Sequence, residues 1–199
     1  MTTKEMSGRG RPRGFDIEQA LAIAQALFHQ RGYDGVGVAE LSKEIGITAP
    51  SLYAAFGSKR QLFERVLQKY VQEEGSRLSA AMAEGETVEA GIAHLFERAA
   101  ELYTADAARP GCLVLDGTRN CTDAEACSLS ARIRQETRQA LRDRIAEKFP
   151  EQASALADYA LTVLMGLSAA ARDGLSQAEL KAVGRVAAAG FSVSAMGAR

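Results

Sequence analysis

The chain has 199 residues, of which 47% are apolar and 25% are charged. These proportions exclude a wholly disordered chain, and the length allows one domain or two small ones. The formal net charge of −1 argues, taken as an average, against a protein covered in basic surface for nucleic acid. Three cysteines, at 112, 121 and 127, are too few for a disulfide scaffold, so a reduced, cytoplasmic protein is expected.

No membrane-spanning segment is expected. Two runs without a charged residue, 159–171 and 186–198, have 13 residues each, and no such run exceeds 14, whereas about 20 are needed to cross a bilayer. Both runs are rich in Ala, Gly and Ser, which fits buried helices.

The surplus of basic side chains is concentrated at the N-terminus. Residues 1–70 have ten basic and seven acidic side chains, and the whole surplus lies within residues 1–13. The run 8–14 contains only glycine, arginine and one proline, so it lacks apolar side chains that pack in a core. One reading is a solvated tail. The other is a flexible arm whose Arg9, Arg11 and Arg13 enter the DNA minor groove, where narrow A·T tracts attract arginine.

The rest of the sequence predicts an all-α fold. Ala, Leu, Glu, Gln and Arg dominate, and alternation of β-branched with polar residues is scarce. About nine helices are predicted, at 16–32, 38–45, 49–56, 58 to about 83, 87–105, about 111–119, 123–148, 151–172 and 176–196. Capping boxes are predicted at Asp16–Gln19, Ser58–Gln61 and Ser176–Glu179.

Residues 38–56 are the most informative stretch for function. Gly46 separates two short predicted helices, and the small residue Ser42 four positions earlier favours a close crossing, as in a helix-turn-helix. The second helix presents small or hydroxyl-bearing residues, which fit a major groove and contact thymine methyl groups, base edges or phosphates. These residues are Thr48, Ala49, Pro50, Ser51 and Tyr53. Lys59, at the start of the next helix, is expected to contact a phosphate oxygen.

This region resembles the N-terminal domain of TetR/AcrR-type transcriptional regulators. The resemblance rests on Phe28, Gly32-Tyr33, 38–41 (Val-Ala-Glu-Leu), 46–48 (Gly-Ile-Thr), 51–56 (Ser-Leu-Tyr-Ala-Ala-Phe) and 58–63 (Ser-Lys-Arg-Gln-Leu-Phe). It covers about residues 14–70 closely and the remainder only in layout. It implies a homodimer that binds a palindromic operator in double-stranded DNA, usually as a repressor, and that a small-molecule effector releases. The expected organisation is a flexible basic arm at 1–13, a DNA-binding domain at 14–70, and a ligand-binding and dimerisation domain at 71–199.

Two places depart from the family pattern. Val36 and Gly37 stand where the family usually has Thr or Ser, so a cap for the helix at 38 and a phosphate contact are missing. Ala54 and Ala55 stand where bulky His or Tyr residues often precede the family's Phe. We therefore expect sequence specificity to depend on methyl contacts and on the arm.

The C-terminal helices supply candidates for dimerisation and for a ligand pocket. Small residues on the last two helices favour a four-helix dimer interface over an internal hairpin. They are Ala160, Gly166, Ala169, Ala170, Ala182 and Ala189. The pocket candidates, each of which also fits a core position, are Phe96, Leu102, Tyr103, Cys112, Leu115 and Met165. Neither a metal site near His29 or His94 nor a cofactor is expected, and no motif indicates an enzyme.

Two other functions remain open from the sequence. Cys112 follows Arg109-Pro110-Gly111 at a predicted helix start, where the dipole and Arg109 are expected to lower the thiol pKa. Together with Cys121 and Cys127 it suggests the same scaffold switched by oxidants or electrophiles, although inert thiols are the simpler reading. A helical protein–protein adaptor without DNA binding is the third hypothesis, which the arm and the outward face of 48–53 disfavour.

The arm hypothesis gives the first prediction. Deletion of residues 1–13 is expected to weaken operator binding at least tenfold. It is also expected to reduce the salt dependence of log K by about two to three units, because three arginines no longer neutralise phosphates. Fluorescence anisotropy across a salt series measures both, and an unchanged affinity would contradict the arm's role.

Overall fold

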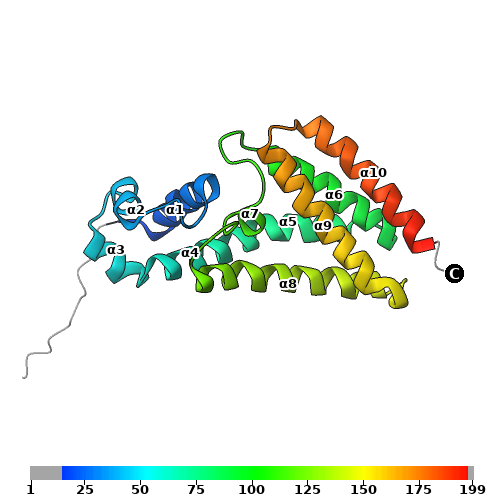
Figure 1. The fold of residues 1–199 in the computed structure, drawn as a ribbon, viewed down its shortest axis with the longest axis horizontal. Helices are drawn as coiled ribbons and strands as arrows, with labels where there is room; N and C mark the ends of the chain where they lie inside the picture. Colours follow the sequence, from blue (N-terminus) through cyan, green and yellow to red (C-terminus); the bar gives the residue numbers. More distant parts are fainter. Residues whose placement is uncertain (1–14, 197–199) are drawn as a thin grey trace, which may run out of the picture.

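The computed structural model describes residues 15–196, and every regular element in that range is a helix (Figure 1). The order is α1 Ile17–Arg31, α2 Val38–Ile45, α3 Ala49–Phe56, α4 Lys59–Tyr70, a π-helical turn Val71–Gly75, α5 Ser76–Ala83, α6 Val88–Thr104, α7 Leu113–Asp116, α8 Ala124–Ala146, a 3-10 turn Pro150–Gln152, α9 Ala153–Arg172 and α10 Gln177–Met196. The predicted all-α fold is thus confirmed, and each predicted segment contains a helix.

Two predicted helices differ in detail. The segment predicted as one helix from 58 to 83 contains the π-helical turn, in which the Ser76 N–H bonds back to the Val71 carbonyl. The wider turn changes the helical phase, so that α4 packs against α1 and α8 while α5 packs against α6. The helix predicted over about 111–119 is only the single turn α7. Left-handed Gly111 (φ +84°) precedes it, and left-handed Asn120 (φ +59°) ends the turns that follow it.

Side-chain caps begin most helices. The Asp16 carboxylate accepts from the Glu18 and Gln19 N–H groups at 2.8 and 3.4 Å, and the Ser58 hydroxyl accepts from Gln61 at 3.1 Å. At Ser176–Glu179 both halves of the capping box form, because the Glu179 carboxylate also accepts from the Ser176 N–H at 2.8 Å. The α2 N-cap, Gly37, has no side-chain cap, as its departure from the family pattern predicted.

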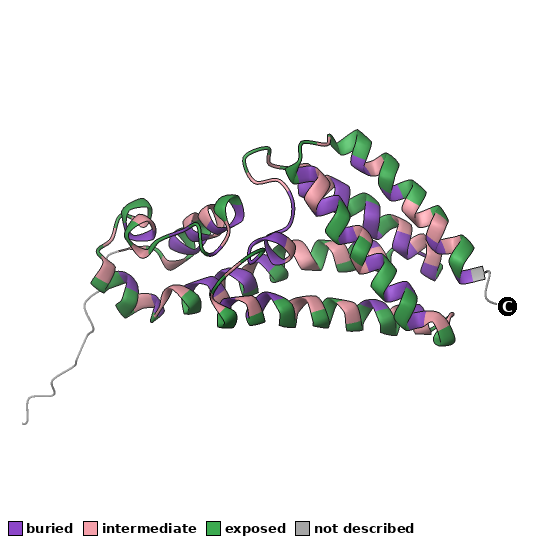
Figure 2. Cartoon of the chain, in the orientation of Figure 1, coloured by how far each residue is buried: buried purple, intermediate pink, exposed green. Residues whose placement is uncertain are grey.

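The first four helices share an aromatic core. Phe63 of α4 meets Phe28 of α1 edge-to-face and packs beside Tyr33, each with ring centroids 5.0 Å apart. Leu41 of α2 and Leu52 of α3 are fully buried in the same core. Figure 2 shows that buried and exposed residues alternate along the helices. Burial of Leu41 and Leu52 in this core holds α2 and α3 in place, which leaves the outer side of α3 exposed.

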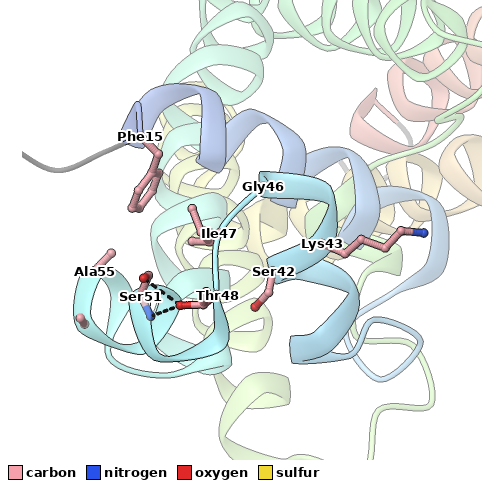
Figure 3. A pocket seen from close by; sticks show the side chains of 9 residues that line it. Phe15, Ser42, Lys43, Gly46, Ile47, Thr48, Ser51 and Ala55 are labelled. Carbon is pink, nitrogen blue, oxygen red and sulfur yellow. Dashed lines mark hydrogen bonds between the residues drawn. The ribbon is translucent and has the colours of Figure 1, made fainter.

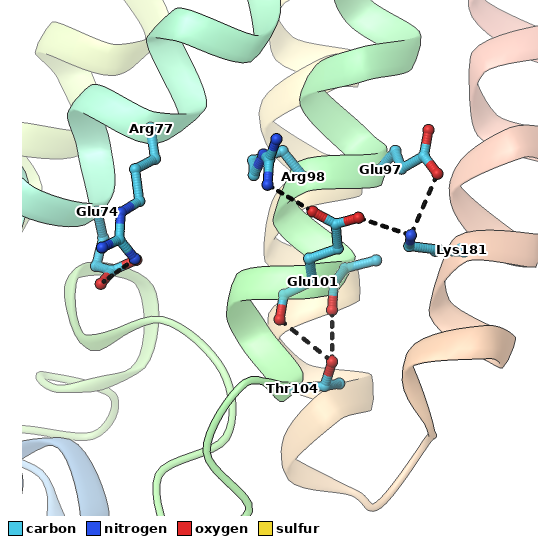
Figure 4. A network of polar contacts seen from close by, with 8 residues as sticks. Glu74, Arg77, Glu97, Arg98, Glu101, Thr104 and Lys181 are labelled. Atoms are coloured by element: carbon cyan, nitrogen blue, oxygen red, sulfur yellow. Dashed lines mark hydrogen bonds and ion pairs between the residues drawn. The ribbon is translucent and has the colours of Figure 1, made fainter.

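The C-terminal helices pack into a bundle in which α6, α9 and α10 contact one another and α9 also packs on α8. Gly184 of α10 lies so close to α6 that an added Cβ would stand 3.3 Å from the Phe96 Cβ. On the surface, the Lys181 ammonium bridges Glu101 and Glu97 of α6 at 2.7 and 3.3 Å (Figure 4). A close backbone approach and an ion-pair network therefore fix α10 on α6.

Helix α9, with the preceding 3-10 turn, is long and apolar enough to cross a membrane by length and composition. The run without charged residues within α9, 159–171, has only 13 residues, so the sequence did not predict a membrane-spanning segment there. Leu156, Ala157, Leu164 and Leu167 of α9 are buried among the neighbouring helices. A core helix of a helical bundle meets the same length and composition criterion, because the side that it buries is apolar.

A buried histidine lies where the N-terminal helices meet the rest of the protein. The His29 ring hydrogen-bonds through Nε2 to the Gly111 carbonyl at 3.2 Å, and the Arg172 guanidinium of α9 donates to the His29 carbonyl at 3.2 Å. Burial lowers the pKa of His29 from 6.5 to about 4, so the ring is neutral at physiological pH.

His29→Gln is expected to make the protein less acid-sensitive. Because the folded pKa lies below the unfolded value, the stability this neutral ring contributes is present above pH 6.5 and is lost as the pH falls towards 4. The wild type should therefore lose about 3 kcal/mol more of its unfolding free energy between pH 7 and 4 than the variant does. Urea unfolding at both pH values measures this, with His94→Gln at an exposed position as control. Equal losses in wild type and His29→Gln would contradict the assignment.

Candidate DNA-binding site

A glycine turn sets the angle between α2 and α3. Gly46 has φ +77°, its N–H bonds to the Lys43 carbonyl at 3.1 Å, and Ile47 N–H reaches the Ser42 carbonyl at 2.9 Å. An added Cβ at Gly46 would meet no atom within 4 Å, so a close approach of the two helices does not require glycine there. Glycine is favoured at position 46 because the left-handed backbone conformation disfavours residues with a Cβ. Ser42 is buried, as a small residue beneath the turn should be.

The outer side of α3 is exposed and lightly polar. Thr48, Pro50, Ser51 and Tyr53 are exposed, with Tyr53 at 48%, and Ala49 is half-buried. The Thr48 hydroxyl caps the helix by accepting from the Ser51 N–H at 3.4 Å, and the two hydroxyls lie 2.9 Å apart (Figure 3). A narrow helix surface with two hydroxyls and a phenol suits contact with base edges and thymine methyl groups.

A surface hollow lies beside this helix and brings in residues that the sequence analysis did not select (Figure 3). Phe15, Lys43, Ala54 and Ala55 line it together with Thr48 and Ser51. The Lys43 side chain is 84% exposed and pairs with Glu44 only at 3.8 Å, and its ammonium points away from α3 (Figure 3). The sequence did not mark Lys43 as a candidate site residue, because a lysine in the last turn of a helix commonly interacts with the carbonyl groups at the helix end.

Lys59 was expected to contact a phosphate oxygen, but its side chain packs against Tyr33. Its ammonium stands 4.0 Å from the Tyr33 ring centroid, and desolvation against this ring lowers the pKa of Lys59. The charge therefore faces Tyr33 and nearby Asp34 at the junction with the C-terminal helices, instead of standing free for a phosphate. The arm residues Arg9, Arg11 and Arg13 lie outside the described residues.

Four of the six predicted pocket residues line one cavity. Leu102, Tyr103, Cys112 and Leu115 surround about 90 Å³ between α4, α6, α8 and α9, together with Tyr70, Arg134, Leu161 and Leu164, which sequence analysis missed. Two predictions are corrected. Phe96 is fully buried in the core under Gly184, and Met165 is 38% exposed on the outer side of α9, because the inward face of that helix has Leu161 and Leu164.

The outer side of α9 and α10 contains most of the predicted dimerisation residues. Gly166, Ala182 and Ala189 are exposed, and Ala169 and Ala170 are half-buried. The prediction that Ala160 lies at the dimer interface is wrong, because Ala160 is fully buried within the protomer. Sequence analysis missed the larger exposed apolar residues of the same two helices, Tyr159, Val183, Val186 and Val193.

The thiols do not have the predicted electrostatics. Burial raises the pKa of Cys112, where the sequence predicted a lowered value. Helix α7 is a single turn with almost no dipole, and Arg109 is paired with Asp106 at 2.7 Å. Burial beside the Asp34 carboxylate raises the pKa of Cys121 to about 12. Both thiols are protonated at neutral pH, which weakens the oxidant-sensor hypothesis. Within residues 15–196, no three His, Cys, Asp or Glu side chains are grouped for a metal ion.

Ala49→Asp is expected to separate DNA binding from folding. An acidic residue in the first turn of a helix favours the helix dipole, so the melting temperature should not fall. A negative charge on the α3 surface repels phosphates, so DNA affinity should fall at least tenfold. Ala124→Asp, at the equivalent first position of α8, is the matched control. DNA affinity that falls equally in both variants, or in neither, would rule out α3 as the reading helix.

Comparison with known proteins agrees with this geometry. Residues 20–66 match the profile of the bacterial regulatory proteins of the tetR family. The chain is 38% identical to the HTH-type transcriptional repressor BdcR of Escherichia coli K12 over 187 residues, covering 94% of both chains. It is 31% identical to the repressor ComR of the same organism, covering 86% of this chain and 87% of ComR. Its fold superposes with a TM-score of 0.82 on a cysteine mutant of the TetR family regulator CifR bound to a 26-base-pair operator, at 33% identity over 90% of this chain and 98% of that one. The chain therefore belongs to the TetR family of DNA-binding transcriptional regulators.

Proposed function

We propose that this protein is a transcriptional repressor that binds a palindromic operator as a homodimer and is released by a small molecule in its C-terminal domain. The observation that carries the proposal is the exposed α3 surface from Thr48 to Tyr53, held outward by the buried Leu52 and Phe56. The relatives BdcR and ComR are both described as repressors, which favours repression over activation.

The homodimer is proposed from the outer side of α9 and α10. Tyr159, Met165, Val183, Val186 and Val193 make up five of the seven large apolar residues exposed within residues 15–196. Apolar residues gathered on two adjacent helices mark a surface that a partner covers. A two-fold axis through this hairpin gives a four-helix interface and two copies of α3, as a palindrome requires.

Release by a ligand requires that the cavity and α3 are mechanically connected. The Tyr33 N–H donates to the Gly117 carbonyl at 2.7 Å, and the Tyr33 hydroxyl donates to Asp123 at 2.9 Å. Asp34 accepts from the Thr122 N–H and hydroxyl at 2.6 and 2.8 Å. The segment that makes these bonds begins at Cys112, Val114 and Leu115, which line the cavity. A ligand that displaces this wall shifts the N-terminal helices of one protomer relative to the other.

The two alternatives have less support. A thiol switch needs a reactive thiolate, and the raised pKa values of Cys112 and Cys121 oppose one. An adaptor that does not bind DNA leaves the exposed α3 surface without a role. We place the protein in the cytoplasm, where the proposed operator lies, and assign no catalytic step to it.

Selection of binding sites from random double-stranded DNA tests the proposal. We expect a recovered palindrome whose half-site centres lie about one helical turn, or a multiple of it, apart. Single half-sites or no enrichment would contradict an operator-binding dimer.

Val186→Glu tests the dimer surface separately. Val186 is 74% exposed, so a charge there should not disturb the protomer fold, but it would be buried at the proposed interface. Sedimentation is expected to show a monomer, with palindrome affinity reduced at least a hundredfold. Ala131→Glu, at an exposed position of α8, should leave both unchanged. A Val186→Glu protein that stays dimeric would exclude this surface.

A further inference from the structure

One cation on the wall of the buried cavity has no carboxylate partner. Arg134 of α8 is half-buried, lines the cavity, and donates through Nη1 to the neutral Val114 carbonyl at 3.2 Å. Within residues 15–196, its neighbours on the same helix, Arg132 and Arg138, are paired with carboxylates, whereas Arg134 belongs to no ion pair. A guanidinium has five N–H donors, so most of those on Arg134 are available to a bound molecule.

The other charged group of the cavity wall, Glu74, already has a counter-charge. The Arg77 guanidinium, three residues along, donates to both Glu74 carboxylate oxygens at 3.3 and 3.5 Å (Figure 4). Glu74 lies on the π-helical turn and Arg134 on α8, so the two charges belong to different elements of the wall. A molecule in the cavity therefore meets one positive charge that no carboxylate of the protein offsets, and this charge favours an anion.

The rest of the cavity suits an alkyl chain. The cavity measures about 90 Å³, which is smaller than the roughly 300 Å³ of a common ligand pocket. A groove of about 380 Å³ between α5 and α8 adjoins it, and both are lined by Val71, Leu78, Ile133 and Leu164. Because these shared residues are aliphatic, an alkyl chain that fills the cavity continues into the groove along an apolar wall.

A second space adjoins the cavity near Tyr70, but its walls are polar. It measures about 180 Å³ and lies beside α1 and α6. Both arginines that line it are paired, Arg109 with Asp106 at 2.7 Å and Arg77 with Glu74 at 3.3 Å. It therefore offers neither an apolar wall for a chain nor an unpaired cation for a head group.

We infer that the effector is an amphipathic anion, with a carboxylate that binds Arg134 and an unbranched alkyl chain that crosses the cavity into the outer groove. This inference rests on the proposed ligand-responsive function. Because Arg134 is only half-buried, a carboxylate there keeps part of its hydration, which lowers the cost of bringing a charge to a largely apolar site. A straight-chain carboxylate is the simplest molecule with these properties.

The same arginine connects the head group to the N-terminal helices. Its bond to the Val114 carbonyl is a bond to α7, and the segment that begins at α7 is hydrogen-bonded to Tyr33 and Asp34. A carboxylate that reorients the guanidinium therefore acts directly on the segment that joins the cavity to the DNA-binding part.

Titration calorimetry of the full-length protein without DNA tests the ligand class. Octanoate is expected to bind at least tenfold more tightly than octylamine, which has the same chain and the opposite charge. It is also expected to bind at least tenfold more tightly than butanoate, because four fewer methylene groups are buried. Octylamine that binds as tightly as octanoate, or equal binding of the two carboxylates, would overturn the inference.

Variants of Arg134 test the position of the head group. Arg134→Gln removes the charge and keeps a donor for the Val114 carbonyl, so octanoate affinity should fall at least tenfold. The affinity for 1-octanol should change less than threefold, which shows that the cavity itself is intact. Arg134→Lys should restore part of the octanoate affinity, because it restores the charge without the planar fork.

Arg132→Gln is the matched control. Arg132 lies on the same helix, is exposed, and pairs with Glu64 at 3.2 Å. This variant should bind octanoate as the wild type does. An octanoate affinity that is unchanged in Arg134→Gln, or that falls equally in Arg132→Gln, would exclude Arg134 as the head-group site.

Operator binding is measured separately, with butanoate at the same concentration as the ionic control, so that the two proposals fail in different ways. If octanoate binds as expected and lowers operator affinity, both are supported. If it binds as expected but the operator complex persists, the ligand class stands and ligand-induced release is wrong. If it does not bind, the ligand class is wrong, whatever the protein does with DNA.

Discussion

The arrangement of the whole protein depends on one buried carboxylate. Asp116 is 7% exposed, accepts from the Ser168 hydroxyl of α9 at 2.5 Å, and pairs with Arg119 at 2.9 Å. The Ser168 hydroxyl in turn accepts from the Cys112 N–H at 2.8 Å. These bonds fasten the segment around α7 to α9, and Arg119 supplies the counter-charge that a buried carboxylate requires.

The same segment faces both functional regions. One side, at Cys112 and Leu115, is a wall of the buried cavity. The other side, from Gly117 to Asp123, is hydrogen-bonded to Tyr33 and Asp34 in the turn after α1. A displacement of a few tenths of an ångström at the cavity therefore has a direct path to the N-terminal helices, without any large rearrangement of the bundle. The net charge of −1 averages a basic surplus in residues 1–70 with an acidic surplus in residues 71–199, which fits the proposed division between DNA binding and regulation.

Local rules predicted the helices and the exposed side of α3 well. The caps at Thr48 and Ser58, the left-handed Gly46 and the alternation of buried Leu52 with exposed Ser51 and Tyr53 all depend on near neighbours in the chain. The errors came from contacts between distant segments. Lys59 is held over Tyr33, Ala160 is buried in the protomer, and Phe96 packs beneath Gly184, and none of these pairings has a signal in spacing.

The sequence by itself therefore determined the all-α class, the helix-turn-helix and the outward residues of α3, because helix periodicity and capping act within a few residues. Only the tertiary structure decided which residues surround the cavity, which thiols are buried, and how α4 is joined to α5. The π-helical turn lets α4 and α5 pack against different helices, and burial among the surrounding helices raises the pKa of Cys112. Both are properties of packing between helices, which the local pattern of the sequence does not determine.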